Sequence, residues 1–195
     1  MSKLLQDQTD EELIGEFQRL NDAAFEILVV RYKDQLTNFA FRFVGDWDDC
    51  NDIVQETFVR VFRNRSSYKP LAKFSTWIYT IAANVAKTAL RRRKLKRLVS
   101  LARSDDAGSQ ELFDIVDEHM STDSQAESAL REERIQRALN ALPVKYREVI
   151  VLRDVQELSY EEIAGVTGAN IGTVKSRINR GRSQLQEMLK DLRND

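Results

Sequence analysis

SYEEIAGVTGANIGTVKSRINRGR, residues Ser159–Arg182, has the residue order of two short helices on either side of a glycine turn. Ser159 can cap the first helix, and Glu162, three residues later, can return a hydrogen bond to the capping residue, as in a capping box. Gly168 follows where that helix must end, and glycine accepts the left-handed backbone that such an end usually needs. The segment therefore predicts a helix-turn-helix.

The second predicted helix has an apolar stripe and an opposite basic face. Val174, Ile178 and Gly181 recur at steps of three and four residues along the stripe. The opposite face combines cations suited to phosphates with short polar side chains suited to base edges. A surface hairpin with solubilising charges is the alternative, but the order of capping box, glycine and basic helix favours DNA binding. The candidate DNA-binding residues are Lys175, Ser176, Arg177, Asn179, Arg180 and Arg182.

Composition and periodicity indicate an all-α protein with two small domains. The chain has 195 residues but only seven Gly and two Pro, which is few for a turn-rich β architecture. The helical periodicity is interrupted by a stretch that is acidic and rich in Ser and Asp. We therefore expect an N-terminal domain over residues 1–97, a flexible acidic linker over 98–126, and a C-terminal helix-turn-helix domain over 127–195.

The formal net charge of −1 is the sum of opposed blocks. Basic runs lie between Lys87 and Arg97 and between Lys175 and Arg182, whereas the segment from Asp105 to Glu127 contains acidic residues and no Lys or Arg. Charges act mainly within a Debye length of about 8 Å, so the local blocks decide what each surface attracts. A near-neutral total is thus compatible with binding to DNA.

Cys50 and His119 are the only cysteine and histidine, which leaves no Cys/His metal cluster and no intramolecular disulfide. We expect no metal and no cofactor, and we interpret Cys50 as a small apolar core residue. An enzyme has little support, because the sequence lacks a Gly-rich phosphate loop and a catalytic histidine. No apolar run approaches the about 20 residues that span a bilayer, so we expect a cytoplasmic protein without membrane insertion.

Two predicted helices of the N-terminal half carry polar faces. The helix over about residues 47–64 turns Ile53, Val54 and Phe58 inward and leaves polar side chains on its other side. The helix that begins near Ser75 has a face on which an amide can bond to bases while neighbouring cations hold phosphates. A plain solvated face would show the same pattern. That face comprises Thr80, Asn84, Lys87, Thr88 and Arg91.

Taken together, these segments resemble a bacterial RNA polymerase sigma factor of the extracytoplasmic-function (ECF) group. Asp52–Phe58, DIVQETF, is similar to the family's D-x-x-Q-E-x-F signature. Lys73–Ala82, KFSTWIYTIA, is similar to its promoter-melting segment, and the helix-turn-helix has the expected place near the C-terminus. The resemblance covers nearly the whole chain.

The resemblance implies a sigma factor that binds core RNA polymerase and directs initiation at a restricted, signal-responsive set of promoters. The implied partners are the clamp helices of the largest polymerase subunit, the flap of the second-largest subunit, promoter DNA and an anti-sigma factor. The basic face of the helix-turn-helix then reads the minus-35 element, and the face from Thr80 to Arg91 reads the minus-ten element. The loop over about 64–74 matches one that captures a flipped base. The implied polymerase-binding residues are Asp52, Gln55, Glu56 and Phe62.

A helix-turn-helix repressor or activator with a sensing N-terminal half is the competing hypothesis. It would account for the C-terminal motif but leaves Asp52–Phe58 and the other basic helix without a purpose. A repressor binds duplex promoter DNA by itself, whereas a sigma factor requires core polymerase.

Overall fold

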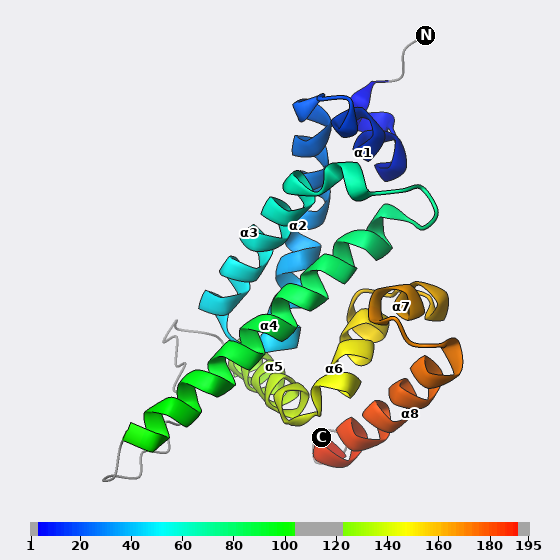
Figure 1. The fold of residues 1–195 in the computed structure, drawn as a ribbon. Coiled ribbons are helices and arrows are strands. Elements are labelled where there is room, and N and C mark those ends of the chain that lie inside the picture. Colours follow the sequence, from blue (N-terminus) through cyan, green and yellow to red (C-terminus); the bar gives the residue numbers. More distant parts are fainter. Residues whose placement is uncertain (1–3, 104–122, 191–195) are drawn as a thin grey trace.

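The computed structural model describes residues 4–103 and 123–190, and within them the chain forms helices and no strands (Figure 1). This confirms the all-α prediction. In the N-terminal half, α2 and α4 lie along each other, with α3 on one side and α1 across their end. The elements of this half are η1 (Leu5–Asp7), α1 (Asp10–Gln18), α2 (Asp22–Val44), α3 (Trp47–Arg63), η2 (Arg65–Ser67) and α4 (Phe74–Arg103).

The C-terminal half is a set of shorter helices that ends in the helix-turn-helix. Its first helix begins at Asp123, and α4 ends only at Arg103, so helices occupy both ends of the predicted linker over 98–126. The acidic residues between these helices, and His119, lie outside the described residues, and the predicted domain boundaries stay a prediction. The elements are α5 (Asp123–Ala141), α6 (Val144–Ile150), the π-helical turn η3 (Val151–Val155), α7 (Tyr160–Thr167) and α8 (Ile171–Met188).

Capping residues set the ends of the two helices in the helix-turn-helix. The Ser159 side chain accepts a hydrogen bond from the Glu162 N–H at 3.2 Å, and the Glu162 carboxylate accepts one from the Ser159 N–H at 2.8 Å. Gly168 ends α7 with a φ of +66°. Asn170 then caps α8, its side chain accepting from the Thr173 N–H at 2.8 Å. The predicted capping box and glycine stop are therefore confirmed.

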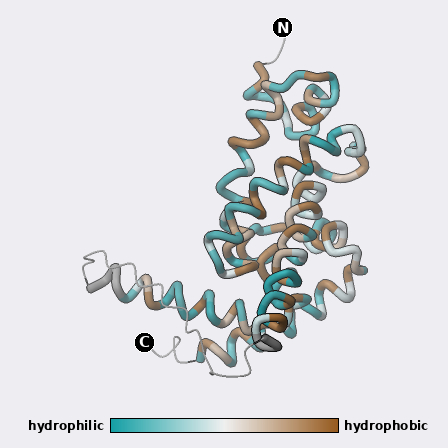
Figure 2. Tube along the Cα trace, turned by 60° about the vertical axis from the view of Figure 1, so that its left-hand side comes forward, coloured by the Kyte–Doolittle hydropathy of each residue, from teal (hydrophilic) through white to brown (hydrophobic). Residues whose placement is uncertain are grey.

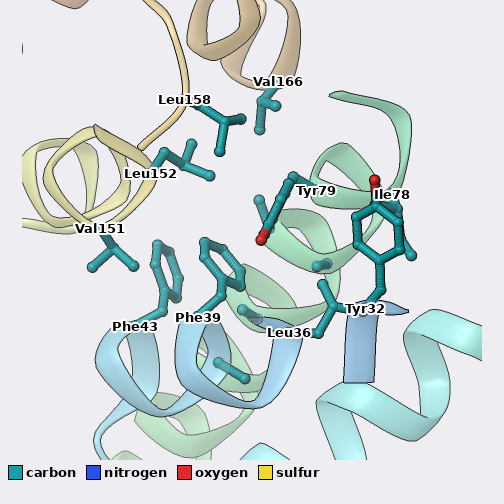
Figure 3. Packing of buried hydrophobic residues seen from close by; sticks show 14 of the residues in the cluster. Tyr32, Leu36, Phe39, Phe43, Ile78, Tyr79, Val151, Leu152, Leu158 and Val166 are labelled. Atoms are coloured by element: carbon teal, nitrogen blue, oxygen red, sulfur yellow. The ribbon is translucent and has the colours of Figure 1, made fainter. Parts of the chain in front are cut away.

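The two halves pack against each other around a shared apolar core (Figure 3). Aromatic side chains of α2 and the Tyr79 ring of α4 face apolar side chains from η3, the segment after it, and α7. The ring centroids of Phe39 and Tyr79 lie 5.5 Å apart. The structure thus joins the two predicted domains by a packed interface as well as by the chain. The residues that line it include Leu36, Phe39, Phe43, Tyr79, Val151, Leu152, Leu158 and Val166.

Helix α4 is buried on two sides, which its sequence pattern did not predict. Ile78 and Ala82 are buried on one side of the helix, and Tyr79 and Ala83 are buried as well. The first face packs on the other N-terminal helices, and the second lies under the C-terminal half. Figure 2 shows that the end of α4 that extends beyond the rest of the molecule is mainly hydrophilic, in agreement with its run of Lys and Arg.

Glu162 has a second role, because its carboxylate also pairs with Lys73 Nζ at 2.9 Å, just before α4 begins. Burial by itself raises the pKa of Glu162, but hydrogen bonds from Ser159 and Lys73 outweigh burial and hold that pKa below its ordinary value. A carboxylate with a lowered pKa stabilises the fold above the pKa of the unfolded chain, and this stabilisation is lost as the pH falls through the folded value.

We therefore expect Glu162→Gln to lower the free energy of unfolding more at about pH 7 than at acidic pH, because protonation of the wild-type carboxyl removes the pairing as the pH falls through its lowered pKa. Urea unfolding at both pH values measures the difference. Glu161→Gln is the matched control, because the neighbouring Glu161 side chain is exposed. An equal loss for Glu162→Gln at both pH values would contradict the assignment of its charge to this pairing.

Candidate nucleic-acid and polymerase interfaces

Helix α8 presents the predicted basic face to solvent. Val174, Ile178 and Gly181 are buried, and a Cβ on Gly181 would lie 2.8 Å from Ile150 Cγ1, so α8 approaches α6 closely at that point. On the other face, Lys175, Ser176, Asn179 and Arg180 are exposed and Arg177 is half-buried. The arrangement offers cations, a hydroxyl and an amide on one surface, which suits a DNA groove.

Three cations of this face already have partners within the domain. Lys175 Nζ lies 5.6 Å from the centroid of the Tyr160 ring, and Arg180 donates to the Tyr146 hydroxyl, whose pKa is lowered by that bond. Arg182 is paired with Asp154, with its Nε 3.1 Å from Oδ2. These contacts orient the side chains, and the carboxylate of Asp154 offsets part of the charge of Arg182.

Only some side chains on the predicted face of α4 are exposed to solvent. Asn84 and Arg91 are exposed, whereas Thr80 and Thr88 are half-buried. The two threonine hydroxyls donate to backbone carbonyls four residues earlier, at 2.7 and 2.8 Å. Asn84 and Arg91 are therefore the side chains on this face best placed to contact a ligand.

Lys87 does not lie free on that face. Its Nζ is 3.0 Å from a Glu148 oxygen on α6, and the side chains of Lys87 and Glu148 are only 24% and 7% exposed. Glu148 and its buried neighbour Arg147 were not predicted, because charged residues on a short helix have the sequence pattern of a solvated surface. The structure places Lys87 in the contact between the two halves.

The polar face of α3 is accompanied by an apolar groove. Asp52 and Gln55 are exposed, and Glu56 is half-buried and pairs with Arg60 at 2.7 Å. Ile53 is buried as predicted, and Val54 and Phe58 pack against the core but stay half-buried. Thr57 is also buried, and its hydroxyl donates to the Ile53 carbonyl.

Phe58 and its neighbours form the groove between α2 and α3. Its volume is about 300 Å³, and its lining is almost wholly apolar side chains with a polar edge. Phe62 is 43% exposed, and its ring packs on Phe17 and Phe25 at centroid distances of 5.3 and 5.5 Å. Phe25, Val59 and Arg63 were not predicted, because the groove is assembled from two helices. The residues that line it are Phe25, Gln55, Phe58, Val59, Phe62 and Arg63.

The loop between α3 and α4 is anchored at its base and exposed at its tip. Gln18 Nε2 donates to the carbonyls of Arg65 and Tyr68, at 2.7 and 3.0 Å. The Tyr68 ring is buried next to Trp77, with centroids 5.4 Å apart, whereas the Leu71 side chain is exposed. The loop therefore has a fixed position at the start of α4.

Cys50 is fully buried, its Sγ lies 3.3 Å from the Thr37 carbonyl, and burial raises the pKa of its thiol. This confirms its interpretation as a core residue. In the described part of the chain, no cluster of His, Cys, Asp and Glu side chains is placed to hold a metal ion. None of the helices described has the length and hydropathy needed to cross a membrane.

Comparison with known proteins gives a family for both halves. Residues 28–96 match the model of sigma-70 region 2, and residues 132–185 match that of sigma-70 region 4. The chain is 36% identical over 169 residues to the ECF RNA polymerase sigma factor SigW of Bacillus subtilis, covering 87% of this chain and 90% of SigW.

Two solved structures share the fold over most of the chain. The structure of CnrH in complex with the cytosolic domain of CnrY has a TM-score of 0.71 and 25% identity, and covers 94% of this chain and 99% of that one. The sigma factor RpoE of Bartonella quintana, solved with the anti-sigma factor NepR, has a TM-score of 0.64 and 28% identity over 85% of this chain and 96% of that one. The matched regions coincide with the two halves described above, and the chain belongs to the family of ECF RNA polymerase sigma factors, which give the polymerase its promoter specificity.

Proposed function

We propose that α3, α4 and α8 of this sigma factor each bind a different target. The groove and polar face of α3 bind the clamp helices of the largest polymerase subunit, through Asp52, Gln55, Glu56 and Phe62. The open face of α4 reads the minus-ten element, and the basic face of α8 reads the minus-35 element. The groove between α2 and α3 carries the polymerase-binding part of this proposal, because an exposed apolar centre with a polar rim is the usual anatomy of a protein interface.

Several further assignments accompany this proposal. The C-terminal half contacts the flap of the second-largest subunit. An anti-sigma factor binds and controls the chain, an assignment supported by the solved complex of the similar sigma factor RpoE with the anti-sigma factor NepR. The protein acts in the cytoplasm, as an initiation factor without catalytic activity of its own. The N-terminal domain spans residues 1–97 and the C-terminal domain 127–195, on either side of the acidic segment.

In the minus-ten surface, Asn84 reads a base edge and Arg91 holds a phosphate, with Thr80 and Thr88 shaping the contact between them. Lys87 joins this surface only after it leaves Glu148. In the minus-35 surface, Ser176 and Asn179 face base edges, and Lys175, Arg177 and Arg180 contact phosphates. Arg182 is a further phosphate contact, whose charge Asp154 partly offsets.

Gln55→Ala combined with Glu56→Ala should weaken binding to core polymerase without unfolding the protein, because both side chains are outside the buried core. A pull-down with core enzyme measures the loss, and circular dichroism checks the fold. Glu133→Ala is the matched control, since it removes the same kind of i,i+4 ion pair, with Arg137, from α5. Unchanged binding by the folded double variant would remove α3 from the proposed interface.

Asn84→Ala should reduce discrimination among minus-ten variants, since a good base contact contributes about 1–3 kcal/mol of discrimination. Arg91→Ala should lower transcription from all promoter variants by a similar factor, because a phosphate contact does not depend on the base sequence. Abortive transcription on a panel of single-base minus-ten variants separates the two effects. If Asn84→Ala lowered transcription from every promoter variant by the same factor, the proposal that Asn84 recognises a base would be wrong.

A further inference from the structure

A carboxylate of η3 lies against the basic face of α8. Asp154 Oδ2 accepts a hydrogen bond from Arg182 Nε at 3.1 Å, and Asp154 Oδ1 accepts a second one from Arg182 Nη2. Lys175 and Arg180 of the same helix contact neutral tyrosine side chains instead. By charge alone, a carboxylate beside a phosphate-binding surface opposes the binding of DNA. Asp154 therefore favours DNA binding only if it contributes something other than charge.

The geometry of the pair leaves part of the arginine available to a second anion. A guanidinium has a side edge, formed by Nε and Nη2, and an end edge, formed by Nη1 and Nη2, and each edge matches two oxygens of a carboxylate or a phosphate. Asp154 occupies the side edge of Arg182. Within the described residues, Nη1 donates to no acceptor. The end edge of Arg182 is thus open to a phosphate.

The backbone that carries Asp154 is firmly held. Val151 and Leu152 of the same turn are fully buried. Their carbonyls accept hydrogen bonds from the N–H groups of Gln156 and Leu158, both at 3.0 Å. An aspartate side chain is short, so a fixed backbone leaves its carboxylate little freedom. The pair therefore ties a long, flexible arginine side chain to a rigid support.

Arg182 shares one edge of α8 with Lys175. The two residues are seven positions apart, which is close to two helical turns, so their side chains leave α8 in nearly the same direction. The Tyr160 ring lies beside this edge, with its centroid 5.6 Å from Lys175 Nζ and 5.0 Å from Arg153 Cζ. Residues from η3 and the start of α7 thus orient the cations along one border of the basic face.

We propose that Asp154 is a positioning residue for promoter recognition, which holds Arg182 by its side edge so that the end edge binds a phosphate of minus-35 DNA. The proposal rests on the minus-35 role proposed above for α8. Asp154 contacts no DNA itself and acts through Arg182.

Positioning and charge act in opposite directions on the affinity for DNA, and positioning is the larger effect. The side chains of Asp154 and Arg182 are 34% and 48% exposed, so water and salt screen the carboxylate. Its repulsion of a phosphate on the other edge of the guanidinium then lowers the affinity by less than about twofold. Immobilising a free arginine at an interface lowers the affinity by about two- to tenfold, and the pair with Asp154 removes this cost in advance.

Asp154→Ala should therefore weaken promoter binding by about two- to fivefold, although it makes the protein more positive. The dependence of binding on salt should also become shallower, by at most about one counterion, because the phosphate contact of Arg182 is less fully formed. If Asp154 acted through charge alone, the same variant would bind DNA more tightly.

The test uses holoenzyme on promoter fragments that wild-type protein and core polymerase select from genomic DNA. Fluorescence anisotropy over a salt series, at a low temperature where the duplex stays closed, measures binding by Asp154→Ala, Arg182→Ala and the double variant. Glu187→Ala is the charge-matched control, because Glu187 is an exposed carboxylate of α8 that pairs with Lys190. Thermal melting followed by circular dichroism checks the fold of each variant.

We expect Asp154→Ala to weaken binding in the wild-type background and to cause no further loss in the Arg182→Ala background, because Asp154 acts through Arg182. Equal or tighter binding by Asp154→Ala would overturn the proposal, as would an equal loss with and without Arg182, and both results leave the role of α8 intact. Unchanged binding by Arg182→Ala would overturn the phosphate contact and the positioning role together. Failure of the wild-type protein to select promoters would instead overturn the proposed function.

Discussion

The contact on which the rest of the arrangement depends is the cap that Gln136 and Arg147 place on the end of α2, through hydrogen bonds to its last carbonyls. It fixes the turn between α5 and α6 against the N-terminal half. Once α6 has that position, Glu148 reaches Lys87, and η3 brings Leu152 against the aromatic side chains of α2. Helices α7 and α8 follow along the chain, so hydrogen bonds made far from α8 contribute to its placement.

Much of the local structure could be predicted from the sequence. The reciprocal bonds of Ser159 and Glu162 depend only on residues three apart, and Gly168 has the left-handed backbone that its position suggested. The apolar stripe of α8 likewise depends on spacing along one helix. These features are confirmed because each is decided by neighbours in sequence. The capping box of Thr9 and Glu12 that begins α1 is likewise local, because it depends only on residues three apart.

The parts that could not be predicted involve residues distant in sequence. Tyr79 is buried between Phe39 of α2 and the C-terminal half, where Gln156 accepts a hydrogen bond from its hydroxyl. Lys87 has the residue type and spacing of a DNA contact, and only the three-dimensional structure pairs it with Glu148. The groove beside Gln55 and Glu56 needs Phe25 from another helix, so the polar half of that surface was predicted and the apolar half was not.

The most direct test of the packing between the two halves is the distance between spin labels on the outer faces of α3 and α8. Pulsed electron paramagnetic resonance measures this distance. Labels at Asp48→Cys and Gln186→Cys sit on exposed positions of these helices, outside the proposed polymerase-binding residues. We expect free protein to give one narrow, short distance, and protein bound to core polymerase and promoter DNA to give a distinctly longer one. A broad distribution in the free protein would contradict the packed interface between the two halves, and the same distance in both states would contradict their separation on promoter DNA.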